Sequence, residues 1–585
     1  MVIFMASIQS RMCRGIKYWY LVESRRVNGK PRPIVIESLG STEKFIARIL
    51  NKEESSVKKS YSHGGIAALL DLAKRLDVVN IINKYTSSQR EYWAEKPLRN
   101  NLTAGATLLL AAIGRVCEPT SKRAWNEWAA ETSCDHLLGI SSEKIDSQHF
   151  WDLMDCIPEG AIENIEAEIL EKTFKEYPLK EGTLLYDTTN FYTFISTEND
   201  RCDIAQRGKN KQKRNDLRQV GMALAVTQEN YIPLLHYTYQ GNMSDCKVFT
   251  KIISSIKKRM QILKIDINQH TIVFDRGCNS KDNLKKIKRL KLHYVGALTP
   301  THHSDLIEDA EGKYTNIKVG ETELEVYRDK REIWGEERTV LVFISEKLRE
   351  GQLRGVYQSL EKKKKRLRAI QRALANPKAK KRSKDTLEKM LDNLLKGQFM
   401  EGLLSYELKA TSPGHFELTY CTEQKKITEL EDRLGFRIIM TNRHDWESEK
   451  IIKSYHGQSS VERAFKNVKN PYHLAITPQF HWTTQKIKVH YFICVLGYLL
   501  SALLYQDAKK TGFQGSLDTL LDTLNNIRLI RSIEGLGKKG RPKVIFELEE
   551  TSSMQKTLLK TFSLSSSHSK PIKIDGFHHY GKATL

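Results

Sequence analysis

The chain has 585 residues, of which 94 are Lys or Arg and 70 are Asp or Glu, so its formal net charge is +24. Such a basic excess favours a polyanionic partner. The nine cysteines include no close CxxC pair, which argues against a zinc finger or a disulfide framework and indicates a reduced, cytoplasmic setting. The longest apolar run, 491–505, is shorter than the roughly 20 residues that span a bilayer, so it predicts a buried helix and no membrane partner.

The first two regions differ in periodicity. Residues 17–39 hold two strand-like runs, 17–22 and 33–36, on either side of Asn28-Gly29, which predicts a β-hairpin within an N-terminal β module at 1–60. Residues 61–178 instead show helical spacing, for example at Leu109, Leu110 and Ile113. This helical region is either a DNA-binding region or a purely structural domain, and the sequence leaves both open.

From residue 179 the sequence pattern predicts mainly β-strands. Strands are predicted at 183–187, 220–226 and 232–239, followed by a helix at 246–260, a strand at 271–275, a helix at 283–290 and a strand at 294–298. Three antiparallel strands followed by alternating helices and strands are typical of a ribonuclease-H-like fold. We therefore assign 179–299 and 444–515 to two parts of a mixed α/β core.

An insertion at 300–443 separates these parts. It has strand signals at 324–327, 339–343 and 415–418, and a charged helical hairpin that breaks at Asn376-Pro377. The lysines of 361–368 either contact DNA or form a solvated helix face. Residues 516–585 are predicted to be a loosely ordered, basic C-terminal extension. The chain has no phosphate-cradling Gly-Lys-Ser/Thr loop, which argues against an ATP-driven enzyme.

Three carboxylates carry most of the chemical information. Asp187 and Asp275 end apolar, strand-like runs, and Glu462 lies on a helix-like stretch. Three such charges repel one another unless a cation is present. Carboxylate oxygens suit Mg²⁺ or Mn²⁺, and a pair of these ions supports in-line phosphoryl transfer. We expect all three side chains to converge on two metal ions.

The segment around Glu462 has two faces if it is one helix. Tyr455, Gln458, Ser459, Glu462, Lys466 and Lys469 fall on a polar face, and Val461, Ala464, Phe465 and Val468 on an apolar one. Glu462 and Lys469 are seven residues apart and would point the same way, about 20° apart. The plainer interpretation is an ordinary amphipathic helix with a Glu462–Lys466 pair.

These motifs resemble the DDE transposases of insertion sequences, in the group whose third motif reads Tyr-x₂-Arg-x₃-Glu-x₆-Lys. Tyr455, Glu462 and Lys469 match that spacing, and Gln458 stands where the arginine is expected. Further matches are Tyr186-Asp187-Thr188-Thr189, the 241–245 Gly-Asn-Met-Ser-Asp turn, Asp275-Arg276-Gly277, and His481 and His490 after the third acid. The resemblance covers roughly 180–510 and implies a ribonuclease-H-like core with a β-rich insertion.

By this resemblance, Asp187, Asp275 and Glu462 are the catalytic residues and hold two Mg²⁺ ions, for which Mn²⁺ can substitute. Tyr455 and Lys469 would hold the transposon end, with Arg276, Arg463 and Lys466 as further phosphate ligands. The implied reaction frees a 3′ hydroxyl at the element's terminus and joins it to target DNA, with the enzyme acting as a homodimer on paired ends in a prokaryotic, nucleoid-associated setting. Two alternatives are a non-catalytic, sequence-specific DNA-binding protein and a ribonuclease-H-like nuclease.

Overall fold

The structure is a computed structural model. It describes residues 6–577 apart from positions 14, 28–29, 51–56, 87–98, 180–181, 209–213, 230, 377–380, 478, 537–541 and 570–571. The chain forms two compact units. Unit 1 contains residues 1–273, 282–292 and 457–585, and unit 2 contains residues 274–281 and 293–456. The sequence therefore returns to each unit after leaving it.

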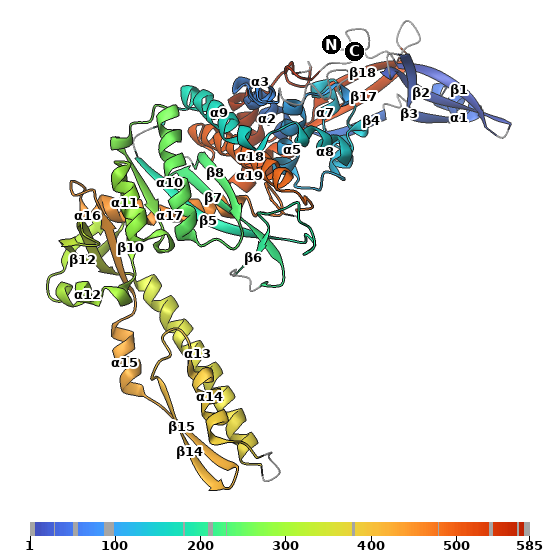
Figure 1. Ribbon diagram of the computed structural model, residues 1–585. Helices are drawn as coiled ribbons and strands as arrows, with labels where there is room; N and C mark the ends of the chain where they lie inside the picture. The colour runs from blue at the N-terminus through green and yellow to red at the C-terminus, as the bar shows by residue number, and fades with distance from the viewer. Residues whose placement is uncertain are drawn as a thin grey trace. The chain divides into compact units, whose positions relative to one another are not determined.

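Unit 1 is built around a long apolar helix, α18 (Thr484–Lys510), which packs against α2 (Gly64–Arg75) and α5 (Ala104–Cys117) (Figure 1). α18 is long and apolar enough to cross a membrane, but 94% of its most apolar window is buried inside the protein. This agrees with the buried helix predicted at 491–505. The predicted helical region is confirmed, and its remaining helices are α3 (Val78–Lys84), α6 (Trp125–Ala130), α7 (Cys134–Leu138), α8 (Ser147–Asp155) and α9 (Ile162–Glu176).

The N-terminal β module is present as an antiparallel sheet of β1 (Ala6–Cys13), β2 (Ile16–Val27) and β3 (Lys30–Ser41), followed by α1 (Thr42–Leu50). β2 and β3 pair from Val27 and Lys30 onward, as the hairpin prediction requires. The predicted turn residues, Asn28 and Gly29, lie outside the described residues.

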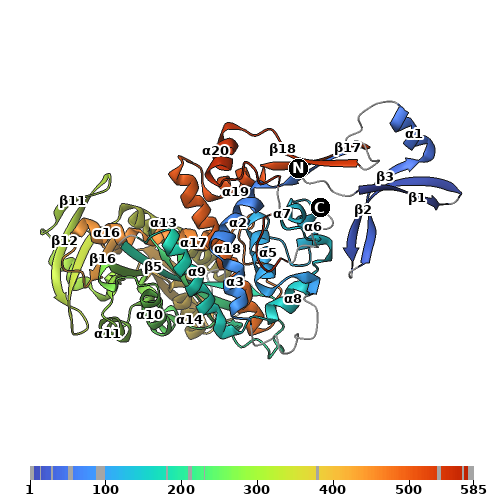
Figure 2. The ribbon, with the colours of Figure 1, turned by 90° about the horizontal axis from the view of Figure 1, so that it is seen from above.

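The C-terminal segment is more ordered than predicted. It forms α19 (Leu517–Asn525), β17 (Arg528–Leu536), β18 (Pro542–Leu548) and α20 (Ser553–Thr561) (Figure 2). β17 pairs with β18 on one side and with β4 (Val57–Ser62) on the other. The prediction of a loosely ordered extension was wrong, because Leu520, Leu524 and Leu529 are fully buried against the rest of the unit.

The β-rich part of unit 1 contains β5 (Gly182–Thr193), β6 (Gln206–Arg207), β7 (Arg218–Thr227), β8 (Pro233–Gln240) and β9 (His270–Phe274). β7 pairs antiparallel with both β5 and β8, and β9 lies on the other side of β5. The spatial order β8–β7–β5–β9 is therefore 3-2-1-4 in chain order, as in a ribonuclease-H-like sheet. α10 (Asp245–Ile262) and α11 (Lys281–Arg289) flank β9 in the sequence.

The strands of unit 2 are hydrogen-bonded in the order β11–β12–β13–β16–β10. These strands are β10 (His293–Leu298), β11 (Thr315–Val319), β12 (Thr322–Glu332), β13 (Glu337–Ile344) and β16 (Phe436–Thr441). α16 (Ser448–His456) packs against β10, β11 and β16, and α12 (Ser304–Ala310) packs against β13. The insertion thus contributes most of these strands, in line with its predicted β content.

Residues 346–434 form what we call the arm of unit 2 (Figure 1). It consists of α13 (Glu346–Leu374), α14 (Lys384–Leu395), β14 (Leu404–Ser412), β15 (His415–Thr422) and α15 (Gln424–Asp432). The predicted helical hairpin is confirmed, although Pro377 lies outside the described residues. The arm has its own apolar core, formed by residues that include Leu360, Leu367, Leu391, Leu418 and Ile427.

Candidate active site

Asp187 lies in the middle of β5, opposite Leu224 of β7. The prediction that it ends a strand was wrong. β5 continues to Thr193 because the threonines and aromatic residues that follow the apolar run also suit a strand. The Oδ1 atom of Asp187 accepts a hydrogen bond of 2.7 Å from the backbone N–H of Thr188.

The direction of the Asp187 side chain follows from its neighbours on β5. Side chains alternate between the two faces of a strand. Tyr186 packs against Phe249 of α10, with 4.9 Å between ring centres, whereas Phe191 packs against Tyr491 of α18 at 5.6 Å. Asp187 shares the face of Phe191, so its carboxylate lies on the side of α18 and away from α10.

The Gly-Asn-Met-Ser-Asp turn lies beside the same part of β5. The hydroxyl of Thr188 donates a 2.5 Å hydrogen bond to Asp245, the first residue of α10. The turn needs glycine at position 241, since a Cβ atom there would lie 2.0 Å from the carbonyl oxygen of Gln219. The hydrogen bond between Thr188 and Asp245 therefore holds α10 against the face of β5 opposite Asp187.

Glu462 lies on α17 (Gln458–Asn467), which packs against β5 and β7. The predicted apolar face is confirmed, because Val461, Ala464, Phe465 and Val468 are at most 5% exposed. Glu462 and Lys466 are exposed on the opposite face, as predicted. The helix that carries the third acid therefore rests on the strand that carries the first.

Lys469 joins these two elements directly. Its ammonium group donates a hydrogen bond to the hydroxyl of Thr189 and lies 5.2 Å from the centre of the Phe191 ring. Thr189 and Asp187 share one face of β5, so Lys469 and Asp187 lie on the same side of the strand. The expected alignment of Glu462 and Lys469 on one helix was wrong, because α17 ends at Asn467.

Tyr455 does not belong to the helix of Glu462. It lies on α16 in unit 2, which ends at His456, and Gly457 separates α16 from α17. Its predicted place on a polar face was wrong as well, since Tyr455 is only 5% exposed. Burial raises the pKa of its hydroxyl, and the nearby negative charge of Asp275 raises that pKa further.

Asp275 directly follows β9, as predicted, and caps the short turn 276–278. Its Oδ1 atom accepts a hydrogen bond of 2.7 Å from the backbone N–H of Arg276. The side chains of both residues are exposed. Unit 2 thus holds Asp275, Arg276 and Tyr455 in one neighbourhood.

Sequence reasoning missed Arg437 of β16. Its guanidinium carbon lies 5.9 Å from the centre of the Tyr455 ring, and its positive charge lowers the pKa of the Tyr455 hydroxyl. The Nε atom of Arg437 is buried and has no hydrogen-bond partner among the described residues. An arginine therefore lies beside Tyr455 even though the arginine position of the third motif is occupied by Gln458.

Arg463 makes contacts within the protein. Its guanidinium donates a hydrogen bond of 3.2 Å to the hydroxyl of Tyr231 and lies 5.6 Å from the centre of that ring. The Tyr231 contact leaves part of its donor set for a phosphate, because a guanidinium has five N–H groups.

The donor set of the three acids suits a hard divalent cation, since it offers carboxylate oxygens without sulfur or imidazole. Among residues that the structure describes, no three His, Cys, Asp or Glu side chains lie close enough together to hold a metal ion. Asp187 and Glu462 belong to unit 1 and Asp275 to unit 2. The convergence of all three carboxylates stays a prediction.

A buried basic cluster lies in unit 1, close to the start of α18. The Lys122 ammonium lies 3.3 Å from Nε2 of His481 and 3.4 Å from Nδ1 of His490. His490 donates through Nε2 to the Ile476 carbonyl at 2.8 Å, so its Nδ1 is the acceptor for Lys122. Burial, with a smaller effect from nearby Arg115, lowers the pKa of Lys122 to about 7.

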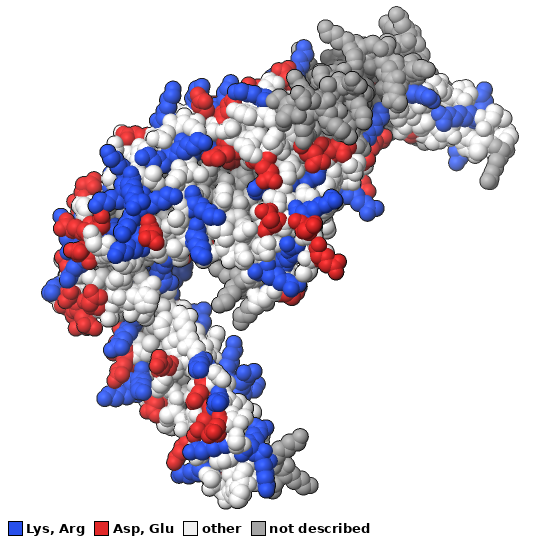
Figure 3. Space-filling model, viewed as in Figure 1, with Lys and Arg blue, Asp and Glu red and all other residues white. Residues whose placement is uncertain are grey.

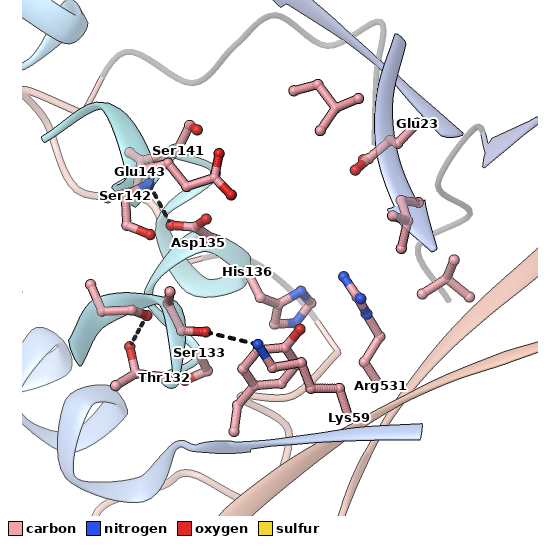
Figure 4. A pocket seen from close by; sticks show the side chains of 18 of the residues that line it. Glu23, Lys59, Thr132, Ser133, Asp135, His136, Ser141, Ser142, Glu143 and Arg531 are labelled. Carbon is pink, nitrogen blue, oxygen red and sulfur yellow. Dashed lines mark hydrogen bonds between the residues drawn. The ribbon is translucent and has the colours of Figure 1, made fainter. Parts of the chain in front are cut away.

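A cavity of about 350 Å³ lies elsewhere in unit 1 (Figure 4). Its lining mixes basic and acidic groups, including Lys59, Arg531, Glu23 and Asp135. None of the acids or DNA ligands predicted from the sequence lines it. The candidate active site is therefore a surface feature around β5 and α17, separate from this cavity.

The fold and these motifs define an enzyme of the ribonuclease-H-like class that acts on nucleic acid. Residues 180–478, just over half of the chain, match the family model described as "Transposase DDE domain". The chain belongs to this family and is a transposase, an enzyme that cleaves and transfers DNA strands.

Two solved structures are similar to parts of this chain at low scores. One is a synaptic complex of the piggyBac transposase with hairpin DNA, with 9% identity and a TM-score of 0.38, covering 86% of this chain and 80% of that one. The other is a Mos1 transposase paired-end complex with the left transposon end, with 7% identity and a TM-score of 0.15, covering 30% and 54%. No curated protein matches the sequence.

Proposed function

We propose that Asp187, Asp275 and Glu462 together bind two Mg²⁺ ions and that the enzyme cleaves the 3′ ends of an insertion sequence and joins them to target DNA. The observation that carries this proposal is the seating of α17 on β5, fixed by the hydrogen bond from Lys469 to Thr189. It brings the elements of the first and third acids into contact across 280 residues of sequence. Asp275 follows β9, the neighbour of β5.

The metal ions would supply an activated water and neutralise charge on the reacting phosphate, and Mn²⁺ can take their place. The protein's own groups then position the DNA. Lys469, on the Asp187 side of β5, and exposed Lys466 are proposed phosphate ligands in unit 1. Arg276 and Arg437 are proposed ligands in unit 2, beside Asp275. Arg463 adds a phosphate contact through those of its guanidinium N–H groups that do not bond to Tyr231.

Tyr455 has a positioning role in this proposal rather than a direct DNA contact. Its side chain is buried, with Arg437 beside the ring, and burial and the charge of Asp275 raise its pKa, so the hydroxyl stays protonated at neutral pH. A protonated phenol donates a hydrogen bond and adds no charge to an already anionic site.

The DNA substrates are proposed to be the element's terminal inverted repeats and a duplex target, acted on by a homodimer on paired ends in a prokaryotic cytoplasm. The test uses the purified full-length protein, Mg²⁺ and labelled duplexes that carry the repeats. Cleavage followed by strand transfer is the expected result. Cleavage without transfer would instead indicate a ribonuclease-H-like nuclease, and binding without either step a non-catalytic DNA-binding protein.

A further inference from the structure

The helix α13 has two sharply different faces. Val356, Leu360 and Leu367 are buried against the core of the arm. The opposite face is basic, and its charged residues fall within about 120° of one another when placed at 100° per residue. These residues, which we call the basic face of α13, are Lys347, Arg354, Lys362, Lys365, Arg366 and Arg372.

The basic face has few acidic neighbours: on α13, Glu350 and Glu361 lie four residues before Arg354 and Lys365. All six side chains are exposed. None of them has a carboxylate partner within salt-bridge distance among the described residues, and the nearby pair between Lys364 and Glu361 lies outside this arc. Like charges repel along such a face unless an anion lies against it. The solvent-facing side of α13 therefore favours a polyanionic partner over a neutral one.

The length of the basic face fits a duplex. Lys347 and Arg372 are separated by roughly 38 Å along the axis, from a rise of about 1.5 Å per residue. One turn of B-form DNA measures about 34–36 Å. A straight helix of this length can therefore meet the phosphates of a duplex over a full turn. Figure 3 shows basic side chains on the arm from its base to its tip.

Two glycines lie on this face. Gly351 and Gly355 are four residues apart, and a Cβ atom added to either would meet nothing within 4 Å. Glycine inside an exposed helix costs about 1 kcal/mol relative to alanine, and no packing within the protein explains it here. A missing side chain does allow another backbone to approach closely. The glycines thus mark where a ligand can come nearest to the helix.

We propose that the basic face of α13 binds the sugar–phosphate backbone of duplex DNA, independently of its sequence. This proposal rests on the proposed function for its partner, and it adds a contact surface outside the catalytic residues. The exposed arginines and lysines supply the contacts, while Gly351 and Gly355 let the backbone approach. The arm then increases the hold on DNA without reading its bases.

The test compares full-length variants in DNA binding at several salt concentrations. The variant K362Q/K365Q/R366Q removes three charges from the basic face. The matched control K389Q/K409Q/K425Q removes three exposed charges from α14, β14 and α15 of the same arm. With a terminal-repeat duplex and a scrambled duplex as probes, we expect the first variant to weaken binding to both equally. The slope of the logarithm of the association constant against the logarithm of the salt concentration should fall in magnitude by about 2 to 3. The control should change neither the affinity nor this slope.

A second variant, G351A/G355A, separates close DNA approach from a merely charged surface. Alanine should raise the melting temperature, because it favours the helix. It should also weaken duplex binding at least threefold if the DNA backbone lies against these positions. Unchanged salt slopes in the charge variant, or equal losses in its control, would overturn the proposal.

Cleavage and binding assays distinguish a failure of this proposal from a failure of the proposed function. In D187N, strand cleavage should disappear while binding and its salt slope stay as in the parent protein. In K362Q/K365Q/R366Q, cleavage should persist at saturating protein. A parent protein that binds through α13 but never cleaves would refute the proposed function and leave the basic face of α13 supported.

Discussion

The guanidinium carbon of Arg437 lies 5.9 Å from the centre of the Tyr455 ring, and Tyr455 also lies near the negative charge of Asp275. The two elements that supply them, β16 and α16, pack together in unit 2. Arg437 thus supplies a positive charge beside the tyrosine of the third motif, although Arg437 itself is not part of that motif.

Replacing Arg437 with Gln should lower strand cleavage about 10- to 150-fold, from the roughly 1.5–3 kcal/mol that a charge-assisted hydrogen bond contributes. The loss of its charge should also raise the pKa of Tyr455, because Arg437 lowers that pKa in the parent protein. Gel assays of cleavage and ultraviolet titration of the tyrosine measure the two effects. Adding Gln458→Arg to R437Q is the informative second variant, since partial recovery of cleavage would show that position 458 can supply the same charge.

Replacing a carboxylate of the proposed metal site should separate chemistry from binding. D187N or E462Q should reduce cleavage at least about 10²- to 10³-fold, on the scale of losing one group that stabilises the transition state. Duplex affinity should change little, because neither acid attracts phosphate. Glu198→Gln, which alters an exposed acid in the loop after β5, is the control and should cleave normally. Normal cleavage by D187N would remove Asp187 from the site.

Shortening a side chain of α18 should cost stability. Leu500 is fully buried, so Leu500→Ala removes packed methyl groups and should lower the free energy of unfolding by about 2–5 kcal/mol. Urea unfolding followed by circular dichroism measures the change. Ile262→Ala, at an exposed position, should change stability by less than 1 kcal/mol. A negligible effect at Leu500 would contradict the description of α18 as a core helix.

The partly buried position of Lys122, against the buried rings of His481 and His490, predicts a pH dependence of stability. Its pKa is about 7 in the folded protein, compared with an ordinary value of 10.5. Between these values the unfolded chain binds a proton that the folded protein lacks, so Lys122 makes stability rise as the pH increases through this window. Below pH 7 both states are protonated and this contribution stays at its minimum.

The variant K122M should flatten that pH dependence and should be at least as stable as the parent at pH 6. Unfolding series at pH 6, 7, 8 and 9 measure this. The other charged and titratable groups around Lys122, namely Arg115, Lys486, His481, His490 and Cys494, remain in both proteins, but the charge of Lys122 lowers the pKa of His481 and His490, so both pKa values should rise in K122M. A parallel pair of pH curves would show that Lys122 keeps an ordinary pKa.

Much of the fold follows from local patterns. The helices around α5, the order of β5, β7, β8, α10 and β9, and the hairpin of α13 and α14 all agree with predictions from periodicity. These elements form because their apolar residues recur at the spacing of one buried face. The buried face of α17 was predictable for the same reason.

Features that depend on distant contacts were not predictable. The break between α16 and α17 falls at Gly457, but a single glycine is tolerated inside a helix, so the helical spacing on both sides does not reveal the break. Arg437 reaches Tyr455 only because β16 and α16 pack together. Spacing within one segment carries no information on any of these contacts.

The pairing of β17 with β4 has a consequence for synthesis of the chain. Val57 of β4 lies opposite Ile533 of β17, so the inner strand of this sheet is made by the ribosome only after more than nine tenths of the polypeptide. Until then β4 has an unpaired edge, and the helices beside it lack the cover of α19. A product that stops before residue 528 leaves that edge open to other chains. Completion of β17 therefore also protects the nascent protein against aggregation.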